Sequence, residues 1–186
     1  MPRALSVRVL LLLAALLLSA PNLAAGLVPL DDVWFKVNLK AVGRTVKEDT
    51  LNLKKAKITG KAFLHVTFTG TLPDGATYDW ELWTKPDGTW LVSDTGTQAF
   101  IGDVSGDQLA VDIAMNAQLS DGKFLDGRAT LLFKLKVKNE GALKKARILT
   151  LGGETTDGTK NGTELFVGSF SMKGHRVKVG KLPFEP

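Results

Sequence analysis

Two nearly identical turns constrain this chain more than any other feature of its sequence. Leu72-Pro-Asp-Gly-Ala76 and Lys85-Pro-Asp-Gly-Thr89 interrupt a stretch of alternating residues that runs from 62 to 93. In each turn proline fixes φ, aspartate bonds back to the chain and glycine takes the left-handed conformation, a combination typical of β-hairpins. The sequence therefore predicts a three-stranded antiparallel meander over residues 62–93.

The length of the turns predicts the register of this meander. With a three-residue loop, Val66 falls opposite Leu82 on an apolar face that we expect in the core. On the other face, the same register places His65 opposite Trp83, and the second turn places Trp83 opposite Leu91. The second face thus mixes aromatic, aliphatic and polar side chains.

This second face has two interpretations. Ligand pockets combine aromatic walls with a few polar groups, so the face is a candidate binding groove. A small apolar or aromatic ligand would stack on Trp83, with His65 and Glu81 orienting its polar end. The alternative is an exterior face that carries aromatic cross-strand pairs. The candidate ligand-binding residues are Phe63, His65, Glu81, Trp83 and Leu91.

The first residues predict a secretory signal peptide over residues 1–26. Arg3 and Arg8 precede a 12-residue apolar run, and small residues lead up to Gly26. The run is too short to span a bilayer comfortably. We therefore expect export to the periplasm or the cell exterior. The chain has no cysteine, which rules out a disulfide framework and favours a bacterial envelope protein.

The remaining 160 residues, 27–186, predict a single all-β domain. The strongest alternation runs from Leu109 to Leu119. A strict two-residue Asp-Gly turn after it would place Val111 opposite Leu132, whereas one extra residue, in the loop or as a bulge, places Val111 opposite Phe133. We choose the second register because it buries both apolar rows together. We expect an antiparallel β-sandwich or partly closed β-barrel of about eight to ten strands. A membrane-spanning barrel is the competing picture, but short lysine-rich strands and a single Tyr argue against it.

The sequence also contains an internal echo. Phe35-Lys-Val-Asn-Leu-Lys40 is similar to Phe133-Lys-Leu-Lys-Val-Lys138, and the Leu-Lys-Lys-Ala-Lys/Arg-Ile pattern occurs at 53–58 and 143–148. One interpretation is a duplicated β-unit over 33–93 and 131–180, in which the two strand pairs superpose. The other is that lysine-flanked amphipathic strands look alike.

Lysines alternate with apolar residues on two of the expected strands. If these strands share a face, they would bind an anionic envelope polymer such as lipopolysaccharide or acidic polysaccharide. The alternative is that the lysines keep strands from pairing at their edges. The net charge is only +3 once Arg3 and Arg8 are removed, and no nucleic-acid partner is expected. The basic-face candidates are Lys36, Lys40, Lys134, Lys136 and Lys138.

The residues offer little catalytic chemistry. Only His65 and His175 are present as histidines, and neither a metal-binding motif, a phosphate-binding loop nor a nucleophile elbow occurs. No catalytic residue, metal or cofactor is predicted. The favoured function is an exported non-enzymatic binding protein of unknown ligand. The alternative is a structural or interaction protein of the envelope that acts through its lysine-rich face, and a hydrolase is least favoured.

Overall fold

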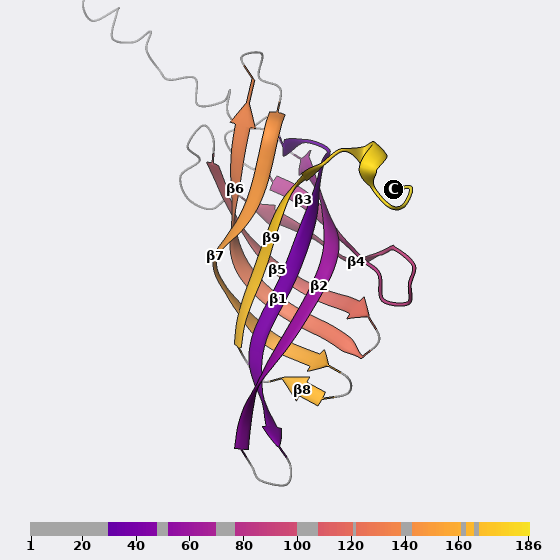
Figure 1. The fold of residues 1–186 in the computed structure, drawn as a ribbon. Coiled ribbons are helices and arrows are strands. Elements are labelled where there is room, and N and C mark those ends of the chain that lie inside the picture. Colours follow the sequence, from indigo (N-terminus) through magenta and orange to yellow (C-terminus); the bar gives the residue numbers. More distant parts are fainter. Residues whose placement is uncertain are drawn as a thin grey trace, which may run out of the picture.

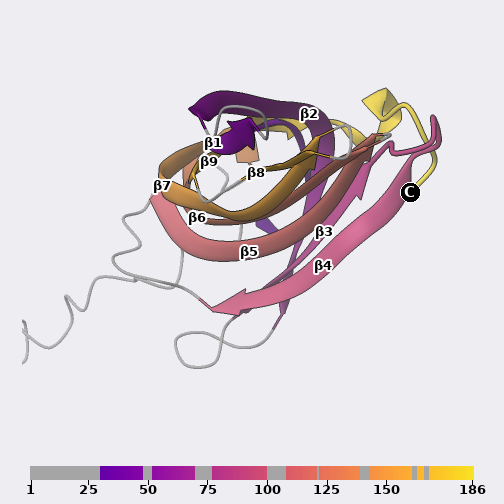
Figure 2. The same cartoon turned by 90° about the horizontal axis from the view of Figure 1, so that it is seen from below.

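The computed structural model contains a single sheet that curls into a nearly closed barrel (Figures 1 and 2). The sheet has nine strands within the described part of the chain, so the predicted all-β class and strand number are confirmed. The predicted signal peptide and the first Pro-Asp-Gly turn lie outside the described residues. The structure describes residues 30–47, 52–69, 77–99, 108–120, 122–138, 143–160, 163–165 and 168–186.

The strands follow one another mostly as antiparallel neighbours. Their order across the sheet is β4-β3-β2-β1-β9-β7-β6-β5, and the short β8 pairs with β7. Beyond the end of β3, β1 and β2 continue as a long twisted hairpin (Figure 1). The bounds are β1 Val33–Lys47, β2 Asn52–Thr69, β3 Thr77–Thr84, β4 Leu91–Ala99, β5 Gln108–Ser120, β6 Lys123–Val137, β7 Leu143–Lys160, β8 Thr163–Leu165 and β9 Gly168–Val177.

Side chains join the two ends of the sheet where no backbone ladder is formed. The backbone N–H of Asn116 in β5 donates to Asp94 Oδ2 in β4, at 2.6 Å. Nearby, the hydroxyl of Thr84 at the end of β3 donates to the carbonyl oxygen of Gln118. These bonds hold the seam between β4 and β5 and nearly complete the barrel.

The barrel interior is a packed apolar core rather than a ligand cavity. Buried apolar residues of β1, β2, β3, β5, β6, β7 and β9 form this core, and within it Phe35 and Phe133 meet edge to face with ring centroids 5.4 Å apart. The space left among the core side chains near Trp80 and Leu109 is about 20 Å³. That volume holds about one water molecule. This space among the described core side chains is too small for a small-molecule ligand.

The meander forms with the predicted faces but with a different register. Val66 lies opposite Trp80 rather than Leu82, and His65 lies opposite Glu81 rather than Trp83. The shift is two residues, so every side chain stays on its predicted face, because side chains alternate with a period of two. Its consequence is that an imidazole and a carboxylate become direct cross-strand neighbours.

The second Pro-Asp-Gly turn confirms the expected backbone and corrects the pairing after it. Gly88 has φ 83°, the left-handed conformation that glycine adopts without strain. Leu91 then pairs with Thr84 instead of Trp83, and a bulge follows where Leu82 pairs with Asp94. The β5–β6 register also differs from expectation, since Val111 lies opposite Leu131 rather than Phe133.

The last strand, β9, lies in the middle of the sheet between β1 and β7. Near Thr150 the β7–β9 ladder is interrupted. There the Thr150 hydroxyl donates to the Met172 carbonyl oxygen at 2.7 Å and accepts from the Met172 N–H at 2.8 Å. One side chain thus replaces two backbone partners, and buried backbone groups remain satisfied.

The two echoed strand pairs do not share a register. Phe35 lies opposite Leu64 in the first pair, whereas Phe133 lies opposite Ile148 in the second. Both pairs are antiparallel hairpins of the same sheet, and their two phenylalanines touch across the core. The duplicated β-unit stays a prediction.

Candidate functional site

Four aromatic side chains form a cage on the outer face of the barrel. We use the name aromatic cage for Trp34 of β1, Phe63 of β2, Trp83 of β3 and Trp90 of the turn before β4. Trp34, Phe63 and Trp83 point away from the core because their sequence neighbours occupy the inward positions. Although they lie on the outside, Trp34 and Phe63 are only 3% and 4% exposed. Such burial means that something covers this face.

The cover is the C-terminal segment of the chain itself. Figure 1 shows this segment leaving β9 and running over the outside of the barrel near β2 and β4. The Phe184 ring stacks on Trp83 with centroids 4.7 Å apart and planes 9° from parallel. It also meets Trp90 and Phe63 at 5.4 Å and Trp34 at 5.8 Å. Phe184 thus occupies the middle of the aromatic cage.

A polar network behind the cage fixes two of its walls. His65 stacks on Trp34 at a centroid distance of 4.3 Å, and its Nε2 lies 2.8 Å from Asp32 Oδ1. Its Nδ1 lies 3.4 Å from Glu81 Oε2, which also accepts a 3.1 Å bond from Trp83 Nε1. Asp32 reaches His65 from a left-handed backbone conformation, with φ 49°. The orientations of both tryptophans are therefore tied to the same imidazole and carboxylate.

The structure brings together four of the five predicted ligand-binding residues. Phe63, His65, Glu81 and Trp83 all belong to the cage or to its polar network. Leu91 does not, because the corrected register pairs it with Thr84 and leaves it 40% exposed.

The sequence reasoning missed several contributors to this site. Asp32, Trp34, Trp90 and Phe184 all complete the cage or its network. The available signals were the outward parity of Trp34 on a half-buried strand and an isolated aromatic residue between the two final prolines.

A second outer face carries positive charge. Its central row is Lys36 of β1, His175 of β9, Arg147 of β7 and Lys134 of β6, each paired directly with the next across the sheet. Lys136 pairs with Lys145 in the adjoining row, and Lys173 follows on the same face of β9. We call these seven exposed residues the cationic patch: Lys36, Lys134, Lys136, Lys145, Arg147, Lys173 and His175.

The cationic patch contains no compensating acid. No described residue paired with its members is Asp or Glu, and none of the seven forms an ion pair with another described residue. Of the predicted basic-face candidates, Lys36, Lys134 and Lys136 belong to the patch. Lys40 lies two rows from Lys36, opposite Ser171, and Lys138 follows the end of β6; both are exposed.

A basic hollow lies where β3 ends. It measures about 620 Å³ and is bordered by Lys40, Lys61, Lys85, Lys123 and Trp90. β3 pairs with β2 only from Phe63 onward, so β2 before that residue has no strand on this side. The hollow thus joins one wall of the aromatic cage to additional positive charge.

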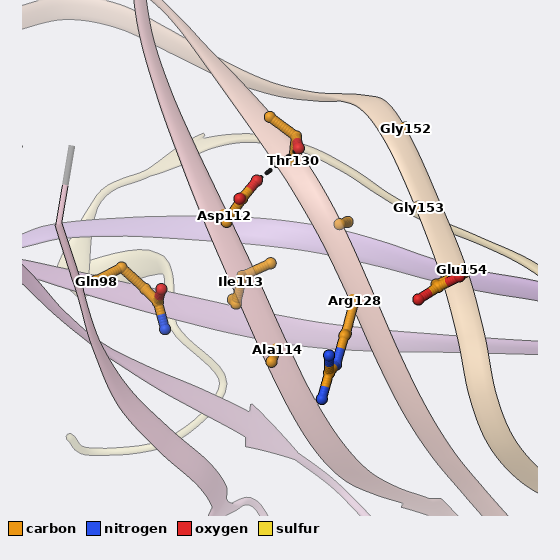
Figure 3. A pocket seen from close by; sticks show the side chains of 10 residues that line it. Gln98, Asp112, Ile113, Ala114, Arg128, Thr130, Gly152, Gly153 and Glu154 are labelled. Atoms are coloured by element: carbon orange, nitrogen blue, oxygen red, sulfur yellow. Dashed lines mark hydrogen bonds between the residues drawn. The ribbon is translucent and has the colours of Figure 1, made fainter. Parts of the chain in front are cut away.

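Another hollow, over β4 to β7, has mixed polarity, and we call it the mixed hollow (Figure 3). It measures about 580 Å³, and Gly152 and Gly153 leave part of its wall without side chains. Arg128 lies opposite Glu154 in the ladder, and the Thr130 hydroxyl donates to Asp112 at 2.5 Å. Two acidic residues, Asp112 and Glu154, line this hollow with one basic residue, Arg128, so the hollow does not extend the cationic patch.

Three acidic residues of β4, β6 and β7 lie beside the mixed hollow. Asp126 of β6 pairs with Asp157 of β7 and with Asn116 of β5, whose N–H is bound by Asp94. Partial burial, followed by the charges of Asp157 and Asp94, raises the pKa of the Asp126 carboxyl above its ordinary value. The described residues include no cluster of three or more His, Cys, Asp or Glu able to hold a metal ion.

The histidine network lacks one element of a hydrolytic site. His65 is held by two carboxylates, but none of its described hydrogen-bond partners is a hydroxyl group. Nucleophilic catalysis needs a nucleophile within reach of its base. The contacts of His65 and Glu81 account for the positioning of the tryptophan rings.

Comparison with known proteins gives no match to this chain, whether by protein family, by curated sequence or by solved structure. Within the described residues, no helix has the length and apolar character required to cross a membrane. Any functional inference therefore rests on the geometry above.

Proposed function

We propose that this protein is an exported, non-enzymatic binding protein that holds an anionic polymer against its cationic patch. The observation that carries the proposal is the row formed by Lys36, His175, Arg147 and Lys134 on four adjacent strands. Lys134 lies directly opposite Arg147, and Lys136 lies directly opposite Lys145. Like charges placed side by side in this way repel one another and are unfavourable for the sheet. A bound polyanion would relieve that repulsion, which gives the row a reason beyond solubility.

The shape of the patch supports a polymer rather than a single small anion. Neighbouring strands lie about 4.8 Å apart, so a row across four strands spans roughly 14 Å. The next row adds Lys136 and Lys145, which widens the surface without adding an acid. Many weak contacts over such a length suit a chain that carries repeated carboxylate, sulfate or phosphate groups.

Export rests on the N-terminal sequence. The basic start, the apolar run and the small residues before 26 are typical of a cleaved leader. In this proposal the mature chain meets its polymer in the envelope or outside the cell. Mass spectrometry of the protein recovered from cell fractions would test cleavage near residue 26 and the compartment together.

Binding to a sulfated polysaccharide such as heparin tests the cationic patch. We expect salt-sensitive binding whose affinity falls on the order of 100-fold between about 50 and 200 mM salt, if about four charges are engaged. The variant Lys134→Gln/Lys136→Gln/Arg147→Gln should lose most of this affinity and flatten the salt dependence.

A charge-matched control separates the patch from net charge. Lys54, Lys55 and Lys61 are exposed on β2, outside the patch, and their replacement by glutamine removes the same three charges. This control should bind nearly as tightly as the wild type. Equal losses in both triple variants, or binding that does not depend on salt, would contradict the proposal.

A further inference from the structure

The C-terminal segment has the conformation and composition of a bound peptide. After β9, a single 3-10 turn over Val179–Lys181 is closed by two backbone hydrogen bonds. Leu182 is then extended, with φ −71° and ψ 144°, as expected before a proline. The chain continues as Pro183-Phe-Glu-Pro186, which has the spacing of polyproline-type ligands.

Phe184 is the principal attachment of this segment. Its ring contacts all four members of the aromatic cage. Residues 182–186 form no hydrogen bond or ion pair with the described strands. The Leu182 N–H donates within the turn, to the Val179 carbonyl oxygen. The residues next to Phe184 in the sequence, Pro183 and Glu185, are exposed. Departure of one ring would therefore free the segment while leaving the sheet ladders intact.

The cage keeps its geometry through contacts that do not involve Phe184. Trp34 is stacked on His65, and Trp83 donates to Glu81, which also faces His65. Walls held in this way lose little freedom when a ligand enters, which favours binding. An aromatic-lined groove that takes an extended proline-containing segment is a recurring mode of peptide recognition.

We propose that the aromatic cage is a peptide-binding site and that residues 182–186 are its tethered occupant. The ligand class is a peptide in which an aromatic side chain lies between prolines, like the occupant itself. A short tether gives an effective concentration in the millimolar range, so a partner peptide must compete with Phe184. This site is distinct from the cationic patch, and the two proposals can fail separately.

The test uses the full chain and two synthetic peptides. One has the sequence of residues 179–186, and the other differs only by alanine in place of the phenylalanine. The variant Phe184→Ala empties the cage and keeps the tail. We expect it to bind the phenylalanine peptide with a change in tryptophan fluorescence and to ignore the alanine peptide. The wild type should bind at least about tenfold more weakly because its cage is occupied.

Further variants make the result decisive. Adding Trp83→Ala to Phe184→Ala should abolish peptide binding, whereas adding Lys36→Gln should not. Concentration-dependent dimers of the wild type that disappear in Phe184→Ala would also support the site, with a second copy supplying the peptide. If Phe184→Ala unfolds, Phe184→Leu replaces it, because leucine keeps apolar volume without a stacked ring. Equal affinity for the two peptides, equal affinity of wild type and variant, or no binding by a folded variant would each overturn the proposal.

Discussion

The aromatic cage and the cationic patch meet on the outer side of β1, where the cage is covered and the patch is exposed to solvent. Trp34 belongs to the aromatic cage and is 3% exposed under the C-terminal segment, whereas Lys36, two residues later, is exposed in the cationic patch. Covering aromatic surface removes apolar area from water and is stabilising. Leaving lysines uncovered avoids the cost of burying charge. The contrast teaches that the outer side of one strand can be covered at one residue and left open to solvent two residues later.

The largest expected effect tests the covered face. Trp34→Ala should destabilise the protein by about 3–5 kcal/mol, the range for removing a buried aromatic side chain. It also removes the ring on which His65 stacks. The matched change Lys36→Ala should stay within about 0.5 kcal/mol, as for ordinary surface sites. Urea unfolding of both variants gives the comparison, and similar costs would show that the two faces do not differ in this way.

An intermediate effect is expected for the covering ring. Phe184→Ala should cost about 1–2 kcal/mol, because aromatic pairs contribute roughly 0.5–1.5 kcal/mol beyond area burial and this ring is only partly buried. Thermal unfolding should show one transition at a slightly lower temperature, with the far-ultraviolet spectrum unchanged. A cost equal to that of Trp34→Ala would mean that the tail is integral to the barrel rather than a separable cover.

The smallest effect concerns the partly buried carboxyl group of Asp126 on β6. Burial and the nearby Asp157 and Asp94 raise the pKa of Asp126 in the folded protein. The folded state therefore binds this proton more tightly than the unfolded state. The resulting stability is present below the ordinary aspartate pKa and is lost as the pH rises through the folded value.

Asp126→Asn removes that loss at neutral pH. We expect a gain of less than about 0.5 kcal/mol at neutral pH, since the site is only partly buried. The gain should disappear in acid, where Asp126 is protonated in both states. Denaturant unfolding at the two pH values measures the difference. A loss of stability at neutral pH would show that the charged form is favoured in the folded protein.

Alternation in the sequence was sufficient to predict strands and their faces, but it could not fix the pairing. Val66 and His65 lie on the predicted faces, yet their partners are displaced by two residues. An even displacement leaves the apolar and polar rows intact, so facial patterning cannot distinguish these registers. The bulge after Leu82 shows the same limit, because one extra residue changes every pair beyond it.

The candidate site was predictable only where its residues share one hairpin. Phe63 and Trp83 come from neighbouring strands, so local reasoning placed them together. Phe184 reaches them from the end of the chain, and its position depends on β9 lying beside β1. The cationic patch has the same origin, since β9 supplies His175 between Lys36 and Arg147. Long-range strand order leaves no signature in local periodicity.

The central position of β9 has a consequence for how the protein folds. Strands β1 to β4 and strands β5 to β7 each form a meander of sequential neighbours, and the last strand joins the two. β9 follows all of these strands along the chain, so until it docks β1 and β7 each have an unsatisfied edge. Such edges favour association with other chains. Pairings between distant parts of a chain also form slowly. Docking of β9 between β1 and β7 therefore closes both edges at once and protects the sheet from pairing with another chain.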